Sequence, residues 1–269
     1  MKVSVVTISF NQGRFLEACL RSVLDQDHAD IEYIVVDAGS SDGSRRIIER
    51  HSDRISRIIF KPDEGPADGL NKGFRCATGD VFCYLNADDI FLPGAFARVV
   101  RDFAVNPDTD VLCGNGYQID ENGRRVRRIF STRWGLRRYA YGACNVVQQA
   151  TFFRSGVFRR AGGFNVQNRT CWDGELLVDM ALRGARFSCV PEFLGAFRVH
   201  DDSISGSGRR LHEYQTDNIR VGLKALGRAP AFFDPLIGYF FQAERSLRYP
   251  MRFVQKMIDR LRRIWLCAR

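Results

Sequence analysis

Residues 78–94 read TGDVFCYLNADDIFLPG, and this stretch decides how the rest of the chain is interpreted. A Thr-Gly-Asp turn precedes residues 81–85, a short apolar run with the β-branched and aromatic content of a buried strand. Asn86, Asp88 and Asp89 follow at once, and Leu-Pro-Gly at 92–94 can start a helix. The acidic side chains therefore lie where a strand ends, which in an open α/β sheet is the ligand crevice. Carboxylates there can hold Mg²⁺ or Mn²⁺, although a single Asp can also be an ordinary helix cap.

The residues on both sides repeat this alternation of strand and helix. From Phe15 the apolar positions take helical spacing, because Phe15, Cys19 and Val23 fall on one stripe. Further helices are expected near 67–77 and 94–105, and Asn122-Gly123 predicts a hairpin turn. Strands are expected at 3–10, 31–36, 55–60, 81–85 and 111–117. Strands that alternate with helices predict an α/β fold with a mostly parallel central sheet flanked by helices.

Three successive predicted strands end in polar turns that carry an aspartate, namely Asp37, Asp63 and Asp88. Each of them alone fits a helix cap. Together, beside glycine-rich turns, they fit a nucleoside diphosphate and a metal ion better, because the ends of parallel strands share one edge of the sheet.

Other nucleotide chemistries are disfavoured by the first turn. A dinucleotide-binding unit needs Gly-x-Gly-x-x-Gly after its first strand, whereas this turn has only Gly13, and a Walker A loop is absent as well. The eight cysteines form no CxxC pair, which argues against a zinc site. No signal peptide and no apolar stretch of about 20 residues is recognised, so we expect a cytoplasmic protein.

The positive charge of the chain is concentrated at its end. Residues 245–269 hold eight basic residues and one acid, a net charge of +7 out of the +9 of the whole chain. In residues 251–266 the cations alternate with apolar and aromatic side chains, which predicts a basic amphipathic helix of the kind that lies on anionic membrane surfaces. A helix packed on the catalytic domain is the alternative. Nucleic-acid binding is not expected, since no nucleic-acid module precedes this tail.

Four motifs in this order resemble inverting family 2 glycosyltransferases with the GT-A fold, of the bacterial polysaccharide-assembly type. They are VSVVTISFN at 3–11, IVVDAGSSDG at 34–43, DGLNKG at 68–73, and ATGD at 77–80 leading into NADD at 86–89. The resemblance covers roughly residues 3–200. It implies a GT-A domain over 1–205, with a nucleotide-sugar half to about 117 and an acceptor half over 118–205, followed by a helical, basic tail over 206–269.

The resemblance also implies the donor site. Asp37 would accept a hydrogen bond from the nucleotide base, and Asn86 would face the ribose at a position where the family has an aspartate. Asp88 would bind a divalent metal, Mg²⁺ or Mn²⁺, and His200 would be a further ligand or touch the diphosphate, although a lone His is otherwise usually structural. The nucleotide-sugar-binding residues implied in this way are Ser9, Phe10, Asn11, Asp37, Gly39, Asp68, Asn71, Lys72, Asn86, Ala87 and Asp88.

Asp173 is the candidate general base. It stands near the start of a predicted helix in the stretch Trp172-Asp173-Gly174-Glu175, where a helix cap is the ordinary interpretation. The resemblance assigns it to the family's catalytic carboxylate. An inverting transfer requires one such base near the acceptor hydroxyl. Glu175 is the fallback for this role.

These observations predict an inverting glycosyltransferase that moves a sugar from a nucleotide sugar, by family habit a UDP-sugar, to a saccharide or polyprenyl-linked acceptor. We expect it to lie peripherally on the inner face of the cell membrane, bound through its tail. One alternative is a nucleotidyltransferase of related fold, which should carry a glycine-rich basic loop after the first strand. Another is a non-catalytic membrane-surface protein, which would have no reason to carry Asp37, Asp88, Asp173 and His200.

Overall fold

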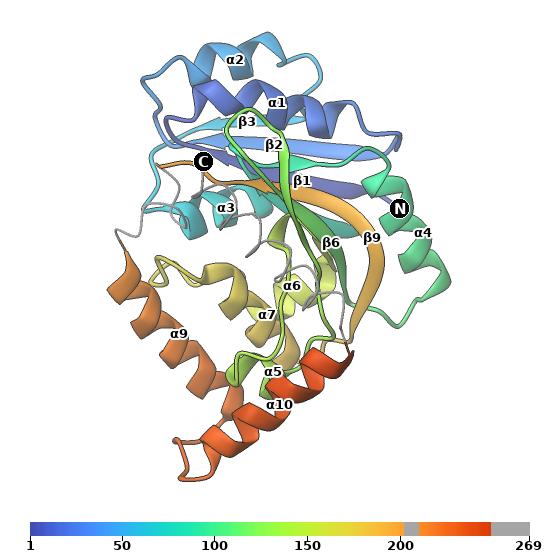
Figure 1. Cartoon of the computed structure of the whole chain (residues 1–269). Helices are drawn as coiled ribbons and strands as arrows, with labels where there is room; N and C mark the ends of the chain where they lie inside the picture. The colour runs from blue at the N-terminus through green and yellow to red at the C-terminus, as the bar shows by residue number, and fades with distance from the viewer. Residues whose placement is uncertain (202–209, 249–269) are drawn as a thin grey trace, which may run out of the picture.

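The computed structural model describes residues 1–201 and 210–248, which form nine strands and the helices around them (Figure 1). Eight strands form one continuous sheet in the order β3-β2-β1-β4-β8-β6-β9-β5, and β7 pairs with β6 beside this path. The strands are β1 (Val3–Ser9), β2 (Ile31–Asp37), β3 (Arg57–Phe60), β4 (Val81–Asn86), β5 (Ile90–Phe91), β6 (Val111–Ile119), β7 (Arg125–Ile129), β8 (Thr151–Arg154) and β9 (Phe187–Arg198).

The first four long strands are parallel, as the sequence predicts. β1 lies between β2 and β4, and β3 pairs with the outer side of β2, all in parallel register. Parallel strands end at the same edge of a sheet, so the polar turns after β1, β2, β3 and β4 all lie on one side of the molecule.

The second half of the sheet is mixed. β8 runs antiparallel to both β4 and β6, while β9 runs parallel to β6 and continues as a long curved strand (Figure 1). β6 and β7 form the antiparallel hairpin that Asn122-Gly123 predicts, with a turn closed by a bond from the amide of Gly123 to the carbonyl of Asp120. The prediction of an α/β fold with a mostly parallel sheet and flanking helices is confirmed.

The helices cover both faces of the sheet. Helices α1, α2 and α4 lie on one face, and α3, α6, α7 and α9 lie on the other. The helices are α1 (Gly13–Leu24), α2 (Ser44–Arg50), α3 (Pro66–Phe74), α4 (Ala95–Val105), α5 (Leu136–Ala140), η1 (Gln148–Ala150), α6 (Ser155–Ala161), α7 (Trp172–Leu182), α9 (Leu211–Leu226) and α10 (Asp234–Arg248).

Alternate residues of each strand point into the two hydrophobic cores on opposite faces of the sheet, because the side chains of a strand have a two-residue period. In β1, Val5 packs under α1 and Val6 packs under α3, and in β4 Leu85 and Tyr84 divide in the same way. Both faces of these strands are buried, so the strands read as continuous apolar runs in the sequence.

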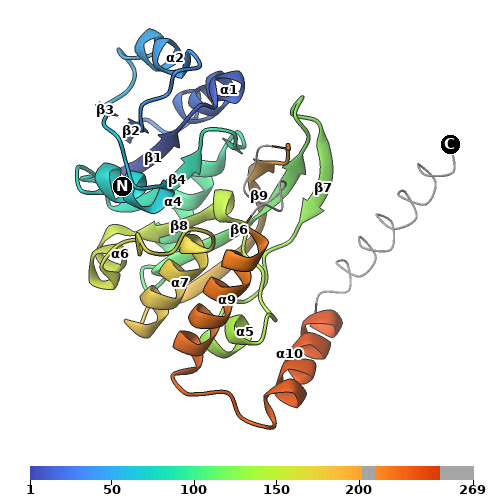
Figure 2. The ribbon, with the colours of Figure 1, turned by 90° about the vertical axis from the view of Figure 1, so that its left-hand side faces the viewer.

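The C-terminal helices pack beyond the sheet. α9 lies against α5 and α7, with Val221 and Ala225 buried, and α10 follows at the far end of the molecule from α1 and α2 (Figures 1 and 2). Within the described residues, no helix is both long and apolar enough to span a membrane. The domain boundary expected at 205/206 and the amphipathic helix expected at 251–266 lie outside the described residues.

Close backbone packing of α3 on β1 depends on Gly73. A Cβ at this position would overlap Cγ1 of Val6 and lie 3.0 Å from its Cγ2. Both atoms belong to a β-branched side chain that is fully buried and has little room to move.

We therefore expect Gly73→Ala to lower the free energy of unfolding by about 1–3 kcal/mol through overpacking. Gly156→Ala in α6 is the matched control, because the nearest neighbour of its added Cβ is the flexible end of Arg160 at 3.5 Å. Urea unfolding should show the control equal to the wild type or slightly more stable. Equal stability of both variants would contradict the close approach of α3 to β1.

Candidate active site

The candidate donor residues meet at the carboxyl ends of three neighbouring strands. Ser9 at the end of β1 lies directly across from Asp37 at the end of β2. On the other side of β1, Ile8 pairs with Asn86 at the end of β4. The sheet register therefore brings together the three strand ends that the sequence singles out.

Asp37 is fully buried and organises the loop that follows it. One carboxylate oxygen accepts bonds from the amides of Gly39 and Ser40, at 3.0 and 2.8 Å, and the other accepts a bond from the Ser40 hydroxyl at 2.6 Å. Gly39 has a φ of +105°, a conformation that glycine adopts without strain. The turn therefore folds around the Asp37 carboxylate.

The loop after β1 is fastened to the same turn. The side-chain oxygen of Asn11 accepts a bond from the backbone amide of Ser41. The backbone amide of Asn11 donates to the Ser40 hydroxyl, and both bonds are 2.9 Å long. Its φ of +51° suits asparagine better than most residues. Beside it, the ring of Phe10 is 60% exposed, and the buried hydroxyl of Ser9 has no partner among the described residues.

Asp88 and His200 come together from β4 and the end of β9. The Asp88 carboxylate lies 3.0 Å from Nε2 of His200, and the His200 ring packs on Phe15 at 4.8 Å between centroids. Neighbouring ligands of an octahedral Mg²⁺ or Mn²⁺ ion are about 3 Å apart, so these two atoms fit adjacent positions on one ion. The described residues contain no group of three His, Cys, Asp or Glu side chains that could hold a metal by themselves. A metal here would need ligands from a bound molecule as well.

Asp89 is the buried centre of this part of the site, a structural role that is not predicted from the sequence. Its carboxylate accepts bonds from Gln149 Nε2 at 2.6 Å, from the backbone amide of Arg198 at 2.9 Å, and from Asn86 Nδ2 at 3.3 Å. Burial, followed by the charge of Asp88, raises the pKa of this carboxyl group, while the three donors lower it. Its place directly after Asp88 in the sequence was the available signal.

Arg198 links the site to the β6–β7 hairpin. Its guanidinium donates to the carbonyl of Asp88 at 2.9 Å and to the carbonyls of Asp120 and Glu121 at 2.8 and 3.0 Å. Arg14 pairs with Glu121 at 2.6 Å and holds the same hairpin tip against the first turn of α1. The hairpin tip is therefore fixed beside Asp88.

The candidates in α3 have their polar groups engaged within the chain. Lys72 donates to Asp68 and to the carbonyl of Pro62, both at 2.6 Å. Asn71 exchanges two bonds with the backbone of Phe164, at 2.8 and 2.9 Å. Ala87 is buried and offers only its backbone. Direct contact of these residues with a nucleotide sugar stays a prediction.

Asp173 lies at the second position of α7 and is largely buried. Burial raises the pKa of its carboxyl group, against a smaller lowering by the backbone amides of Gly174 and Asp173 itself. Among the described residues, no cation lies within ion-pair distance of this carboxylate. The carboxylate is thus held at the start of a helix without a charged partner.

Glu175 has the opposite surroundings two residues later. Arg220 binds both of its carboxylate oxygens at 2.8 Å, and Lys224 and Asn168 add bonds of 3.0 and 2.8 Å. These donors outweigh its burial and lower the pKa of the carboxyl group. Glu175 therefore fastens α9 to α7 and has no free oxygen to take a proton, which removes it as the fallback base.

Three tyrosines from different elements lie within electrostatic reach of Asp173, and no sequence motif indicates them. Burial raises the pKa of Tyr84, Tyr139 and Tyr214, and in each the nearby Asp173 charge adds to the effect. The Tyr139 hydroxyl packs so closely on Gly174 that any Cβ there would overlap it. The Tyr84 hydroxyl is buried without a partner among the described residues. No local sequence pattern joins β4, α5 and α9 in this way.

Comparison with known proteins identifies related chains. The family model described as "Glycosyl transferase family 2" matches residues 4–161. An uncharacterised glycosyltransferase of Nostoc sp. is 28% identical over 284 residues, covering 100% of this chain and 88% of that protein. Another from Mycobacterium tuberculosis is 31% identical over 182 residues, covering 67% of this chain and 69% of that protein.

Two solved structures show the same fold. S. aureus TarS 1-349 in complex with UDP-GlcNAc superposes with a TM-score of 0.71 at 18% identity, covering 93% of this chain and 73% of that chain. The mannosyltransferase PcManGT from Pyrobaculum calidifontis in complex with GDP-Man and Mn²⁺ gives 0.65 at 19% identity, covering 96% and 73%.

The contrast between Asp173 and Glu175 predicts opposite effects on stability. Glu175→Gln leaves two cations without their carboxylate, but Arg220 and Lys224 are more than a third exposed, so water screens the loss. We expect about 2 kcal/mol of lost unfolding free energy, below the roughly 3–5 of a fully buried pair.

Asp173→Asn, the control, should leave stability at pH 7 unchanged or higher, since it removes an ionised carboxylate that burial disfavours. In the wild type, the Glu175 contribution is present above the ordinary glutamate pKa and is lost as the pH falls from there towards the lowered pKa. Urea unfolding of both variants at several pH values measures this. A larger loss for Asp173→Asn would refute the two assignments.

Proposed function

The chain belongs to glycosyl transferase family 2 and is a glycosyltransferase, and from that premise we propose that it transfers a sugar from a nucleotide sugar to an acceptor hydroxyl with inversion, using Asp173 as general base. The observation that carries the assignment is the difference between the two carboxylates of α7. Asp173 has no cationic partner among the described residues and a raised pKa, whereas Glu175 is held by two cations.

The donor is assigned to the edge where β1, β2 and β4 end. Ser9, Asp37 and Asn86 are adjacent there, and the exposed ring of Phe10 lies next to Ser9 in the chain. Asp37 has its oxygens turned towards its own loop amides, so it also holds the loop against which a base would lie. TarS binds UDP-GlcNAc on this fold, which supports a UDP-sugar as the donor.

A divalent metal is assigned to Asp88 and His200. Their facing atoms are 3.0 Å apart and fit two neighbouring ligand positions, and PcManGT has been solved with GDP-Man and Mn²⁺. A Mg²⁺ or Mn²⁺ ion bound there would neutralise the charge of the departing diphosphate. Asp89, held by Gln149 and Arg198, keeps Asp88 in place for this.

The chain's own groups account for the proton transfer. A base must be deprotonated to accept the proton of the acceptor hydroxyl, and the raised pKa of Asp173 makes it a better acceptor than an ordinary aspartate. Tyr139, which packs on Gly174, restricts the space beside that carboxylate. An acceptor sugar held against this ring would present its hydroxyl to Asp173.

The acceptor is proposed to be a saccharide or a polyprenyl-linked saccharide of bacterial polysaccharide assembly. We place the protein peripherally on the cytoplasmic face of the cell membrane. The support is the net charge of +7 over residues 245–269, most of which lie outside the described residues.

Asp173→Asn should keep donor binding and lose most turnover, by about 10²–10⁴-fold, because it removes the base and leaves the strand ends untouched. In the wild type, kcat/KM should rise with pH through an apparent pKa above the ordinary aspartate range, since burial raises the pKa of Asp173. Transfer of radiolabelled sugar from UDP-sugars measures both. Near-normal turnover of Asp173→Asn would remove the base assignment.

Metal dependence can be tested by thermal shift with UDP or GDP. Nucleotide and Mn²⁺ together should raise the melting temperature of the wild type more than nucleotide alone, because binding stabilises the folded state by mass action. Asp88→Ala and His200→Ala should lose the Mn²⁺-dependent part of the shift. Arg101→Ala, at an exposed arginine of α4 away from these strand ends, serves as the control and should keep it. A full Mn²⁺ effect in both site variants would contradict the proposed ligands.

A further inference from the structure

Helix α10 is attached to the domain along one narrow stripe. Tyr141 donates to Asp234 at 2.7 Å, Arg245 donates to the carbonyl of Gly142 at 2.7 Å, and Arg138 pairs with Glu244. Phe241 stacks on Tyr141 with 5.8 Å between ring centroids. All these contacts go to the end of α5 and the turn after it.

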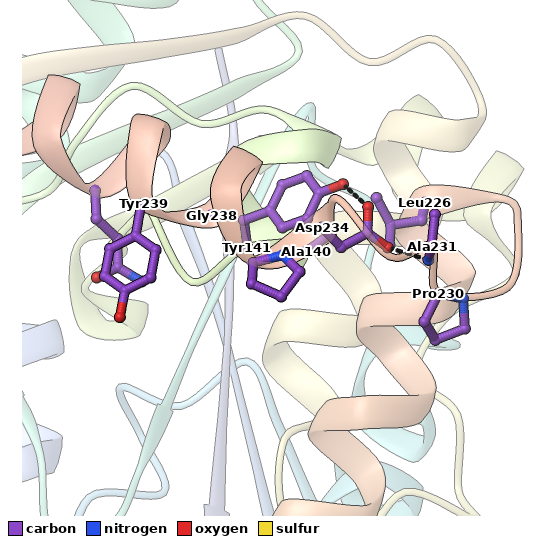
Figure 3. Close-up of a pocket in the computed structure, with 10 residues that line it drawn as sticks. Ala140, Tyr141, Leu226, Pro230, Ala231, Asp234, Gly238 and Tyr239 are labelled. Atoms are coloured by element: carbon purple, nitrogen blue, oxygen red, sulfur yellow. Dashed lines mark hydrogen bonds between the residues drawn. The ribbon is translucent and has the colours of Figure 1, made fainter.

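The packing behind α10 is incomplete. A cavity of about 630 Å³ lies between α10, the end of α9 and the turn after α5, and Figure 3 shows Tyr141, Asp234 and Pro230 among the residues that line it. Gly238 is the one buried residue in the helix. The domain therefore holds α10 mainly through polar anchors and buries little of its apolar surface.

The opposite side of α10 carries a regular apolar stripe. Leu236, Phe240, Ala243 and Leu247 follow each other at intervals of four, three and four residues, which places them on one face of a helix. Leu236, Phe240 and Leu247 are 66%, 67% and 83% exposed.

Two more aromatic rings extend this surface at the start of the helix. Phe232 and Phe233, in the turn before α10, are 89% and 63% exposed. We call the three exposed helical residues (Leu236, Phe240 and Leu247) together with these two rings the α10 stripe. Large apolar side chains gathered on one outward face mark an interaction site rather than ordinary surface.

The charges around the α10 stripe select the partner. Both acids of the helix point inward and are paired, Asp234 with Arg228 and Glu244 with Arg138. The outward face of the helix carries no acid. Arg248, the last residue of the helix, is exposed. The sequence then continues with six more basic residues and one acid to residue 269. An apolar stripe flanked by cations complements the apolar interior and anionic headgroups of a bilayer.

We propose that the α10 stripe is the element that inserts into the surface of an anionic lipid bilayer. The helix lies along the membrane plane. Its anchored side rests on the turn after α5, and the α10 stripe lies among the acyl chains. Arg248, at the last position of the helix, meets the headgroups. This assigns docking to described residues 232–248, in addition to the charge of the tail.

Membrane docking through α10 also restricts the class of acceptor molecule, and this consequence rests on the proposed function. The residues that anchor α10, Arg138, Tyr141 and Gly142, flank Tyr139, whose hydroxyl packs on Gly174 next to Asp173. A bilayer held at α10 therefore lies on the acceptor half of the molecule, while α1 and α2 beside the donor strands are at the far end (Figure 1). That orientation suits an acceptor sugar carried on a membrane lipid.

The test compares two triple variants of the full chain in vesicle co-sedimentation. The stripe variant is Leu236→Ser/Phe240→Ser/Leu247→Ser, and the control is Val105→Ser/Val126→Ser/Leu182→Ser, which changes three exposed apolar residues elsewhere. The probes are vesicles of phosphatidylcholine alone and of phosphatidylcholine with phosphatidylglycerol. Both variants alter exposed side chains, and equal melting temperatures would show that each is folded.

We expect the wild type and the control to bind the anionic vesicles, and the stripe variant to bind about tenfold or more weakly. Binding of the stripe variant equal to that of the wild type would overturn the proposal, because the tail would then suffice. The wild type could instead form an oligomer without lipid and fail to bind vesicles, while the stripe variant is monomeric. That result would overturn the proposal in favour of a second copy of the chain on this face. UDP-sugar binding, measured without vesicles in all three proteins, reports on the proposed function separately and should be equal in all of them.

Discussion

The buried carboxylate of Asp89 is the constraint on which the arrangement of the site depends. It receives donors from three separate parts of the chain: Asn86 at the end of β4, Gln149 in η1, and the backbone of Arg198 at the end of β9. A buried carboxylate without such donors would be very costly, so these elements are held together. Asp88 precedes Asp89 by one residue, and His200 follows Arg198 by two. The bonds to Asp89 therefore bring Asp88 and His200 to 3.0 Å from each other.

The two carboxylates of α7 also differ in whether cations stabilise their charge. Glu175 uses its charge to hold α9 on the domain through Arg220 and Lys224, and it is structural for that reason. Asp173 lies two residues earlier, has no cationic partner among the described residues, and keeps a raised pKa because it is buried. Environments that push neighbouring carboxyl groups apart in pKa commonly distinguish a catalytic acid or base from its neighbours. The far helix α9 therefore takes part in defining the site as well as the fold.

Much of the donor half could be predicted because its determinants are local. The strands before Asp37 and Asn86 are short apolar runs, their parallel pairing follows from the alternation with helices, and parallel strands place their ends together. The role of Asp89 is not local, since its partners Gln149 and Arg198 are 60 and 109 residues away. The engagement of Glu175 by α9, and of Asn71 by Phe164, likewise depends on tertiary packing. The antiparallel strand β8, inserted between β4 and β6, also leaves no periodic signal in four residues.

In the proposed arrangement, one edge of the sheet holds the nucleotide sugar while Asp173 faces the reacting carbon from the acceptor side. A crystal structure of the Asp173→Asn variant with a UDP-sugar and Mn²⁺ would place all of these groups in one measurement. We expect the nucleotide along Ser9, Asp37 and Asn86, the metal on Asp88 and His200, and residue 173 on the side of the anomeric carbon opposite the diphosphate. A nucleotide bound elsewhere, or a sugar turned away from residue 173, would contradict it.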